Sequence, residues 1–298
     1  MRSGVLTLPL ADYVRDPAPT PSLSASLAHL LLTRSAQHAW LAHPKLNPAW
    51  KPAAAEAMDI GTIAHALVLE NDASRIVVID AADWRTTAAK AARDEARAAG
   101  KLPVLTARRD SIFEMVTRAR AAIAESELAA AFADGQPEQT LVWQDDGVWC
   151  RCRPDWLTTD RRVAIDYKTT AGSAEPKAWA RGPLLAMGYD LQAAFGLRGI
   201  QAVCQPRDCA FVFMVQEIEP PYAVSFVGLA PAFVAFAEQK RAAAVRLWAA
   251  CLQDNRWPGY PLRVAWAEPP KWAESQWSEQ NALDWPTPQS VEGGVEAL

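Results

Sequence analysis

The stretch CRCRPDWLTTDRRVAIDYKTT, residues 150–170, constrains the fold of this 298-residue chain more than any other. Two segments with strand-like alternation flank the polar turn TTDRR, and this pattern is typical of a β-hairpin. Side chains alternate between the two faces of a strand, so Asp166 and Lys168 project from the same face. Antiparallel pairing across the turn can bring Asp155 close to Asp166. The stretch therefore predicts two carboxylates and one ammonium group gathered at a strand end.

Such a group of charges suggests a metal-dependent reaction. Two neighbouring carboxylates repel each other unless a cation lies between them. Oxygen ligands favour Mg²⁺, which usually takes one or two protein carboxylates and adds waters and substrate phosphate oxygens. Lys168 could then stabilise the negative charge that develops at phosphorus during hydrolysis of a phosphodiester. The alternative is an ordinary Asp–Lys pair on a surface hairpin, because the D-x-K pattern alone is too short to distinguish the two.

Composition and charge indicate a globular protein that can bury a core, with 50% hydrophobic and 21% charged residues. No apolar run approaches the roughly 18 residues of a membrane span, so we expect a cytoplasmic protein with no membrane partner. The five cysteines show no zinc-site spacing, which favours free thiols. A net charge of −4 argues against a protein coated with positive charge but allows a local basic groove.

The positions of apolar residues, Pro and Gly predict the order of elements. Residues 1–22 are Pro-rich and are expected to be irregular. We expect helices at 22–42, 53–70, 84–126 (in two parts), 183–197 and 231–253, and strands at 75–80, 138–143, 148–157, 163–168, 209–216 and 222–229. This order predicts a single α/β domain over 23–267 with a mixed central β-sheet flanked by helices. The Trp/Pro-rich tail, 268–298, has no lasting periodicity, and we expect its end to be mobile.

Several segments together carry a resemblance to a known superfamily. GTIAHALVLE, RPDWL, IDYKTT and YDLQAAF follow one another in the order and approximate spacing of the PD-(D/E)xK nucleases. Within that superfamily the chain resembles the phage and prophage recombination exonucleases, namely the exonuclease VIII nuclease domain and lambda exonuclease-like enzymes. The resemblance runs from about Ser22 to about Trp272 and includes the RTTAAKAA stretch and the RWPGYPL ending. It implies a restriction-endonuclease-like core.

The resemblance also implies a metal centre. Asp155 and Asp166 would be metal ligands, the backbone carbonyl of Tyr167 a further ligand, and Lys168 the catalytic lysine. His65 matches the histidine of the family's G-x-x-x-H motif and would also reach the metal. From the sequence alone, a histidine on an apolar helix face is more often structural than a ligand. With one imidazole among oxygen ligands, Mn²⁺ should be able to replace Mg²⁺.

Two further residues are assigned near this centre. Gln192 matches the family's downstream glutamine and is a candidate catalytic residue, with Tyr189 on the same helix face as a candidate DNA contact. Relatives often carry a tyrosine four residues after this glutamine, where this chain has Gly196. Glu138, on the strand before the hairpin, is either an acid in the outer shell of the metal or a solvated residue.

The remaining candidates concern DNA. Ser24 and Ser26 align loosely with residues that grip the 5′ phosphate in relatives, although helix capping is the favoured role for serines at these positions. A basic helical stretch resembles the arch through which relatives thread a strand, and the alternative is a solvated helix face. The basic candidates for phosphate contact are Arg34, Arg85, Lys90, Arg151 and Arg153.

The resemblance implies a metal-dependent exonuclease that degrades linear double-stranded DNA from 5′ to 3′. Such enzymes leave a 3′ single strand for a single-strand annealing protein, and they form ring-shaped homo-oligomers. In-line attack by water is the expected mechanism. One alternative is an endonuclease or repair nuclease of the same superfamily, and another is a catalytically inactive DNA-end-binding module. The retention of Asp155, Asp166 and Lys168 argues against the inactive module.

Overall fold

The structure is a computed structural model that describes residues 2–52, 60–206 and 208–284, so the first part of the helix expected at 53–70 lies outside the described residues. The chain divides into two compact units, Met1–Gly259 and Tyr260–Leu298. The predicted boundary between domain and tail at 267–268 stays a prediction. The sheets that the structure describes all lie in the first unit.

A mixed five-stranded sheet forms the centre of the first unit, in the order β10-β9-β8-β7-β4. Its strands are β4 (Gly135–Pro137), β7 (Trp156–Thr158), β8 (Val163–Thr170), β9 (Ala210–Glu217) and β10 (Val224–Gly228). Strands β8 and β9 run parallel, and the other neighbours in this sheet are antiparallel. A mixed sheet flanked by helices confirms the predicted fold class.

Two smaller sheets complete the β-structure. The first has the order β1-β5-β6, with β1 (Gly4–Thr7), β5 (Gln139–Asp145) and β6 (Val148–Cys152) pairing antiparallel. The second pairs β2 (Ile76–Ile79) with β3 (Leu102–Leu105) in parallel. Strand β3 lies where a break between two helices was expected, because its buried Leu102 and Val104 side chains give it a packed position beside β2.

The strand predicted at 148–157 is divided between two sheets. Strand β6 ends at Cys152 in the three-stranded sheet, and β7 begins at Trp156 in the five-stranded sheet. Pro154 lies between them and cannot donate a ladder hydrogen bond, which explains the break. Asp155 is therefore the residue at which the chain enters the five-stranded sheet.

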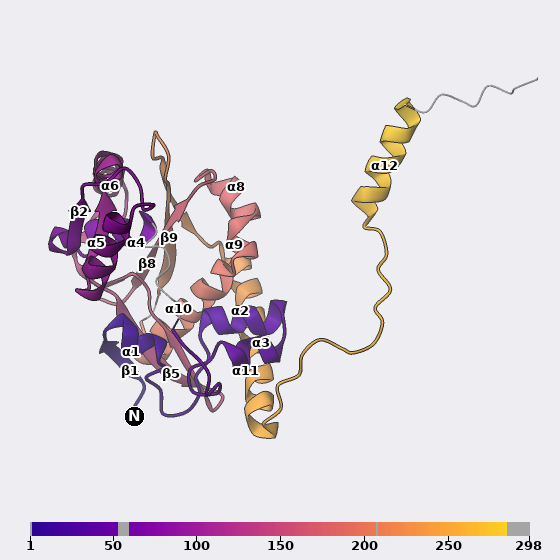
Figure 1. Ribbon diagram of the computed structural model, residues 1–298. Helices are drawn as coiled ribbons and strands as arrows, with labels where there is room; N and C mark the ends of the chain where they lie inside the picture. Colours follow the sequence, from indigo (N-terminus) through magenta and orange to yellow (C-terminus); the bar gives the residue numbers. More distant parts are fainter. Residues whose placement is uncertain (1, 53–59, 207, 285–298) are drawn as a thin grey trace, which may run out of the picture. The chain divides into compact units, whose positions relative to one another are not determined.

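Helices cover both faces of the central sheet. Figure 1 shows α4 and α6 on one face and α10 on the other. The apolar contacts follow strand alternation: Ile165 and Tyr167 of β8 pack toward α4 and α6, whereas Ala164 packs in the cluster that includes α10. The helices of this unit are α1 (Leu10–Val14), α2 (Ala25–Thr33), α3 (Ala36–Leu41), α4 (Ile60–Val68), α5 (Thr87–Ala98), α6 (Thr106–Glu125), α7 (Ala129–Ala133), α8 (Pro176–Arg181), α9 (Pro183–Ala186), α10 (Tyr189–Cys204) and α11 (Pro231–Asp254), with one 3₁₀ turn at Ala73–Arg75.

Residues 1–22, expected to be irregular, contain β1 and α1. Strand β1 pairs with β5 from Gly4 opposite Val142 to Thr7 opposite Gln139. The edge of β5 offers unpaired backbone groups, and a short N-terminal strand satisfies them. The helix expected at 22–42 is in turn two helices, because Ser24 and Ser35 each cap a separate one.

The second unit contains α12 (Lys271–Asp284). A helix in the tail was not predicted, since its apolar residues show no lasting period. Its start follows two prolines, and its interior holds Ala, Glu, Gln and Leu, which favour helix formation. Among the described helices of both units, none is long and apolar enough to cross a membrane.

A buried ionic cluster fixes the chain between α1 and α2. The Asp16 carboxylate is fully buried and accepts hydrogen bonds from the backbone N–H (2.9 Å) and the hydroxyl (2.7 Å) of Ser22. It also lies 3.2 Å from both His43 Nε2 and a guanidinium nitrogen of Arg151. Burial alone would raise the pKa of Asp16, but the hydrogen bond with His43 and the charge of Arg151 outweigh it and lower the pKa from 3.8 to about 2. The ionised carboxylate therefore stabilises the fold.

Replacing Asp16 by Asn should lower the free energy of unfolding at pH 7 by about 2 kcal/mol, because each pKa unit corresponds to about 1.4 kcal/mol. The depressed pKa makes this contribution complete above pH 3.8 and removes it as the pH falls toward 2. Denaturant unfolding of both proteins between pH 7 and pH 3 should therefore give converging curves. Asp94→Asn, at an exposed carboxylate, serves as the control and should change little. A difference between Asp16→Asn and wild type that is independent of pH would contradict this assignment.

Candidate metal centre

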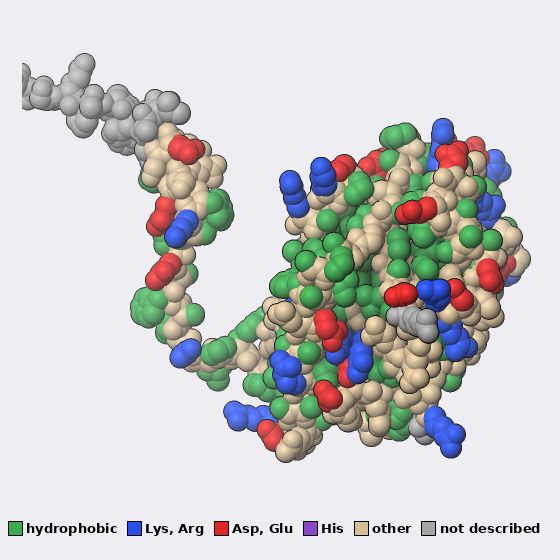
Figure 2. Space-filling view, turned by 180° about the vertical axis from the view of Figure 1, so that it is seen from behind, with side chains coloured by type: hydrophobic (Ala, Val, Ile, Leu, Met, Phe, Trp, Pro, Cys, Tyr) green, Lys and Arg blue, Asp and Glu red, His purple; other side chains and the backbone are tan. Residues whose placement is uncertain are grey.

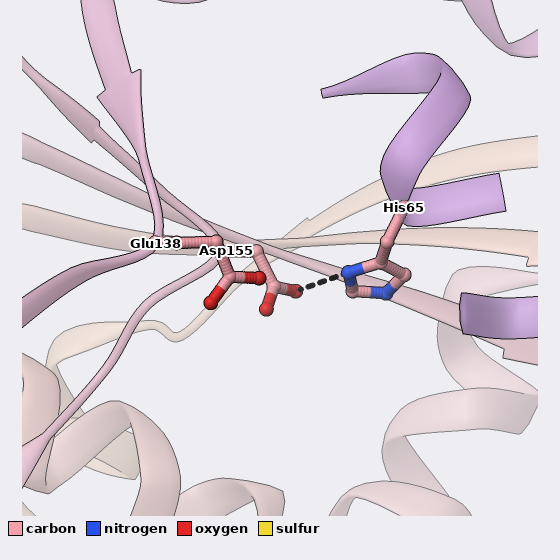
Figure 3. A group of neighbouring side chains, drawn as sticks. All are labelled: His65, Glu138 and Asp155. Atoms are coloured by element: carbon pink, nitrogen blue, oxygen red, sulfur yellow. Dashed lines mark ion pairs between the residues drawn. The ribbon is translucent and has the colours of Figure 1, made fainter. Parts of the chain in front are cut away.

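Three side chains from separate elements meet at the edge of the five-stranded sheet. His65 of α4, Glu138 between β4 and β5, and Asp155 before β7 each offer one ligand atom, and these atoms lie within 4.8 Å of one another. Figure 3 shows the two carboxylates side by side with the His65 ring pointing toward them. His65 Nδ1 is 3.4 Å from a carboxylate oxygen of Asp155.

The two carboxylates lie where the chain crosses between the two larger sheets. Glu138 connects β4 of the five-stranded sheet to β5 of the three-stranded sheet, and Asp155 precedes the return from β6 to β7. The Glu138 N–H donates to the Asp155 carbonyl (2.9 Å), which fastens the two crossings together. Glu138 has φ of 57°, in the left-handed region. Local backbone geometry therefore brings these two acids together although they are distant in sequence.

The hairpin of β7 and β8 places Asp155 beside the catalytic candidates of β8. Trp156 pairs with Ile165, and continuing this register by one residue puts Asp155 opposite Asp166. The Tyr167 N–H donates to the Asp155 carboxylate (2.7 Å). A single carboxylate thus accepts a backbone hydrogen bond from β8 and faces His65 of α4.

The orientation of His65 leaves one ring nitrogen for a cation. His65 Nε2 lies 2.6 Å from the Tyr167 carbonyl oxygen, so the hydrogen-bond network assigns the proton to Nε2. Nδ1, which faces Asp155, then keeps its lone pair. Burial lowers the pKa of His65 and favours this neutral form. The Tyr167 carbonyl, predicted as a metal ligand, is the hydrogen-bond partner of His65 in this structure.

Asp166 and Lys168 form a separate ion pair next to the three ligand candidates. Both project from the same face of β8, and their charged groups are in contact. The fully buried Asp166 carboxylate also accepts a hydrogen bond from the Gln192 amide of α10. Asp166 is thus placed to hold Lys168, and it does not belong to the group formed by His65, Glu138 and Asp155.

The electrostatics of the centre favour binding of a cation. Burial, and then the charge of Asp166, raises the pKa of Asp155 well above 3.8, so its ionised form is destabilised in the protein alone. Burial of Lys168 would lower its pKa, but the carboxylates of Asp166 and Asp155 outweigh this and raise it to about 12, so its ammonium group stays charged. Two carboxylates and one neutral imidazole at this spacing fit a divalent cation such as Mg²⁺ or Mn²⁺.

The centre opens into a cavity of about 700 Å³. A second cavity of about 500 Å³ lies next to it, and the predicted DNA contacts Arg153 and Tyr189 line both. Ser24 and Ser26, at the N-terminus of α2, line the second cavity together with Gln192. Both alternatives for Ser24 therefore have a basis, since its side chain caps α2 and also borders a cavity.

Other predicted phosphate contacts lie elsewhere. Arg151 is buried, and its guanidinium group pairs with Asp16 and donates to the Ser22 carbonyl (3.0 Å), so its role in lining a phosphate path stays a prediction. Arg85 is highly exposed and pairs with Asp83, and Arg34 follows the C-terminal end of α2. Lys90 is exposed on α5. None of these four lines either of the two cavities at the metal centre.

Surface charge is mixed on the face that Figure 2 draws. Acidic and basic side chains are interspersed there around a hollow lined by hydrophobic side chains. The described side chains of that face form no large positive patch. Attraction for a phosphate at the metal centre therefore depends on individual cations, of which Lys168 and Arg153 line the cavity.

The sequence offered no signal for two residues that line the metal-centre cavity. Leu10 and Tyr13 belong to α1, in a segment that was expected to be irregular and lies outside the family resemblance.

The glycine at position 196, where relatives often carry a tyrosine, has a structural explanation. A Cβ atom there would overlap the ring of Phe211 in β9, so the close packing of α10 on the sheet requires glycine.

Replacing Asp155 by Asn should raise the stability of the metal-free protein, because it removes a carboxylate whose ionised form the site destabilises. Below pH 3.8 the raised pKa means that the carboxyl group is protonated in both the folded and the unfolded protein, so it does not lower the free energy of unfolding. Above its pKa in the folded protein the group is ionised in both states, and it then lowers the free energy of unfolding by its full amount. The gain should therefore be present at pH 8 and absent below pH 3.8. Thermal unfolding in EDTA tests this.

The same unfolding experiment with Mg²⁺ or Mn²⁺ supplies the control. The cation should raise the midpoint of the wild-type protein and leave that of Asp155→Asn almost unchanged. An Asp155→Asn protein that is less stable than wild type in EDTA at pH 8 would show that the carboxylate is not electrostatically strained.

Comparisons with known proteins bear on the family and on the fold. A sequence model of the family described as "PDDEXK-like domain of unknown function (DUF3799)" matches residues 26–265. None of the curated proteins compared with the chain matches it. A crystal structure from Eubacterium rectale, described as a "Putative exonuclease", is similar with a TM-score of 0.56 and 12% identity, covering 91% of this chain and 98% of that chain.

At this identity the likeness shows a shared fold. A second structure, described as SSO0001, has a TM-score of 0.25 and 10% identity over 63% of this chain and 86% of that chain. The family match includes α4, the β7–β8 hairpin and α10, so it contains His65, Asp155, Asp166, Lys168 and Gln192. The chain therefore belongs to the family of PDDEXK-like domains of unknown function (DUF3799), within the PD-(D/E)xK nuclease superfamily.

Proposed function

We propose that the protein is a metal-dependent exonuclease that hydrolyses phosphodiester bonds of linear double-stranded DNA from 5′ to 3′. The 3′ single strand that remains would serve recombination through a single-strand annealing protein. The observation that carries this proposal is the group of Asp155, Glu138 and His65, with the Lys168 ammonium beside it, in a cavity open to substrate. The polarity, the annealing partner and a ring-shaped homo-oligomer come from the family resemblance.

The residues of the centre have distinct proposed roles. Asp155, Glu138 and His65 would hold the divalent cation, with Asp166 next to them. Such a cation, when bound, polarises a phosphate oxygen and lowers the pKa of water. Lys168 lies at the same cavity with its charge fixed by Asp166, and it would stabilise the charge that develops on the phosphate during attack.

Gln192 would act as a positioning residue in this scheme. Its amide holds Asp166, which in turn holds Lys168. Replacement of Gln192 would therefore change the rate through the orientation of the lysine, without loss of a group that contacts the phosphate.

The second cavity supports cleavage from an end. It lies beyond Arg153 and Tyr189 as seen from the metal centre, and the N-terminus of α2 borders it. Backbone N–H groups at a helix N-terminus attract anions. A terminal 5′ phosphate held there would place an internal phosphodiester toward the metal centre. An endonuclease of the same superfamily remains the second candidate, because the same centre would cut internally if DNA could pass through without an end.

Lys168→Met should lower kcat by about 100- to 1,000-fold while the protein stays folded, since it removes one group that stabilises developing charge. The assay follows release of label from linear duplex DNA labelled at the 5′ end of one strand, with closed circular DNA in parallel and Mg²⁺ either supplied or chelated. Lys177→Met, an exposed lysine on α8, is the matched control and should retain activity.

Each outcome distinguishes the candidate functions. Metal-dependent release of labelled mononucleotides from linear DNA alone supports the proposed exonuclease and its polarity. Nicking of the circle would assign an endonuclease. Binding of DNA ends without cleavage in either metal would assign an inactive end-binding module and contradict the proposal.

A further inference from the structure

Among the described residues, three line both cavities at the metal centre, and these are Tyr13, Arg153 and Tyr189. The metal ligand candidates border one cavity, and the N-terminus of α2 borders the other. A DNA strand that extends from the second cavity to the metal centre must pass these three side chains. We call them the neck.

The neck includes a residue from outside the family match. Tyr13 belongs to α1, whereas the matched region begins at residue 26. The Arg153 guanidinium lies 5.8 Å from the Tyr13 ring centroid, donates to the Leu8 carbonyl (2.6 Å) and pairs with Glu138. A continuous set of contacts therefore runs from α1 through Arg153 to a ligand candidate of the metal centre.

The other side of the neck is fixed by packing. The Tyr189 ring stacks on Trp179, with centroids 5.5 Å apart and an angle of 12° between the planes. The Lys168 ammonium group lies 4.9 Å from the centroid of the Tyr189 ring. The neck thus presents two tyrosine rings with cations close to each of them. Arg153 and Arg151 (5.5 Å) lie near the Tyr13 ring, and Lys168 lies near the Tyr189 ring. Aromatic rings bind unpaired nucleobases by stacking, and the cations attract the phosphates on either side.

We propose that Tyr13 stacks on a nucleobase near the 5′ end of the strand that is cut, and that it thereby positions the following phosphodiester at the metal centre. This inference rests on the proposed function and adds a specificity-determining residue to it. Because every base has a π-face, the contact would not depend on base identity. It would depend on the presence of a base.

An abasic site separates this role from a structural one. The probe is a duplex oligonucleotide with a 5′ phosphate and a fluorophore at the 3′ end of the same strand, prepared with all bases or with one abasic sugar at the first, second or third position. Binding is measured in Ca²⁺, which takes oxygen ligands as Mg²⁺ does, and the recovered probe is checked on a gel for integrity. Wild type should bind one of the three abasic probes about 10-fold more weakly than the intact one, within the range known for base stacking.

The variants then identify the residue. Tyr13→Ala should bind the intact probe about 10-fold more weakly than wild type and show no further loss with the abasic probe. Tyr13→Phe keeps the ring and should behave as wild type. Phe113→Ala, which removes an exposed ring of α6 that lines neither cavity, is the control and should also behave as wild type. Thermal unfolding of each variant verifies that the first unit is folded.

The contradicting results are distinct. A Tyr13→Ala protein that still discriminates against the same abasic probe would overturn the inference, as would a wild type that cuts linear DNA but binds all probes equally. In both cases the proposed exonuclease would stand. A wild type that neither binds nor cuts any of these DNAs would overturn the proposed function together with the inference.

Discussion

The electrostatic repulsion between Asp155 and Asp166 is the constraint around which the site is arranged. The register of β7 and β8 places these carboxylates opposite each other in a buried position, and burial raises the pKa of Asp155. The protein compensates for one of them internally, because Lys168 and Gln192 contact Asp166. Asp155 contacts a neutral imidazole and a backbone N–H, and a second acid, Glu138, lies beside it. The charge of Lys168 lowers the pKa of Asp155, but burial and the charge of Asp166 outweigh it. A divalent cation would balance the negative charge of the Asp155 carboxylate.

The rest of the fold positions these charges. The chain crosses twice between the five-stranded and three-stranded sheets, and each crossing contributes one acid. Helix α4 supplies the imidazole and α10 the glutamine from opposite faces of β8. Backbone contacts hold the arrangement, as Glu138 donates to the Asp155 carbonyl and Tyr167 donates to the Asp155 side chain. Pre-organisation of this kind lets the site bind a cation without a change of fold.

Strand alternation and the family resemblance allowed much of the site to be predicted. Asp166 and Lys168 share a face because they lie two apart on one strand, and the sequence is sufficient for that inference. The position of Glu138 could not be decided in advance, since it depends on a left-handed residue at a crossing between sheets. The buried pairing of Arg151 with Asp16 could not be predicted, because the two residues are 135 positions apart in the sequence and no local pattern connects them. Tyr13 had no signal at all, because its role arises from the packing of α1 beside Arg153.

The most direct test of this account is the position of a bound cation. Crystals of the protein soaked in Mn²⁺ and measured by anomalous diffraction would locate the ion without reference to activity. We expect a peak within coordination distance, about 2 Å, of Asp155, Glu138 and His65 Nδ1. A peak held by Asp166 without Glu138 and His65, or no ion near Asp155 at saturating Mn²⁺, would contradict it.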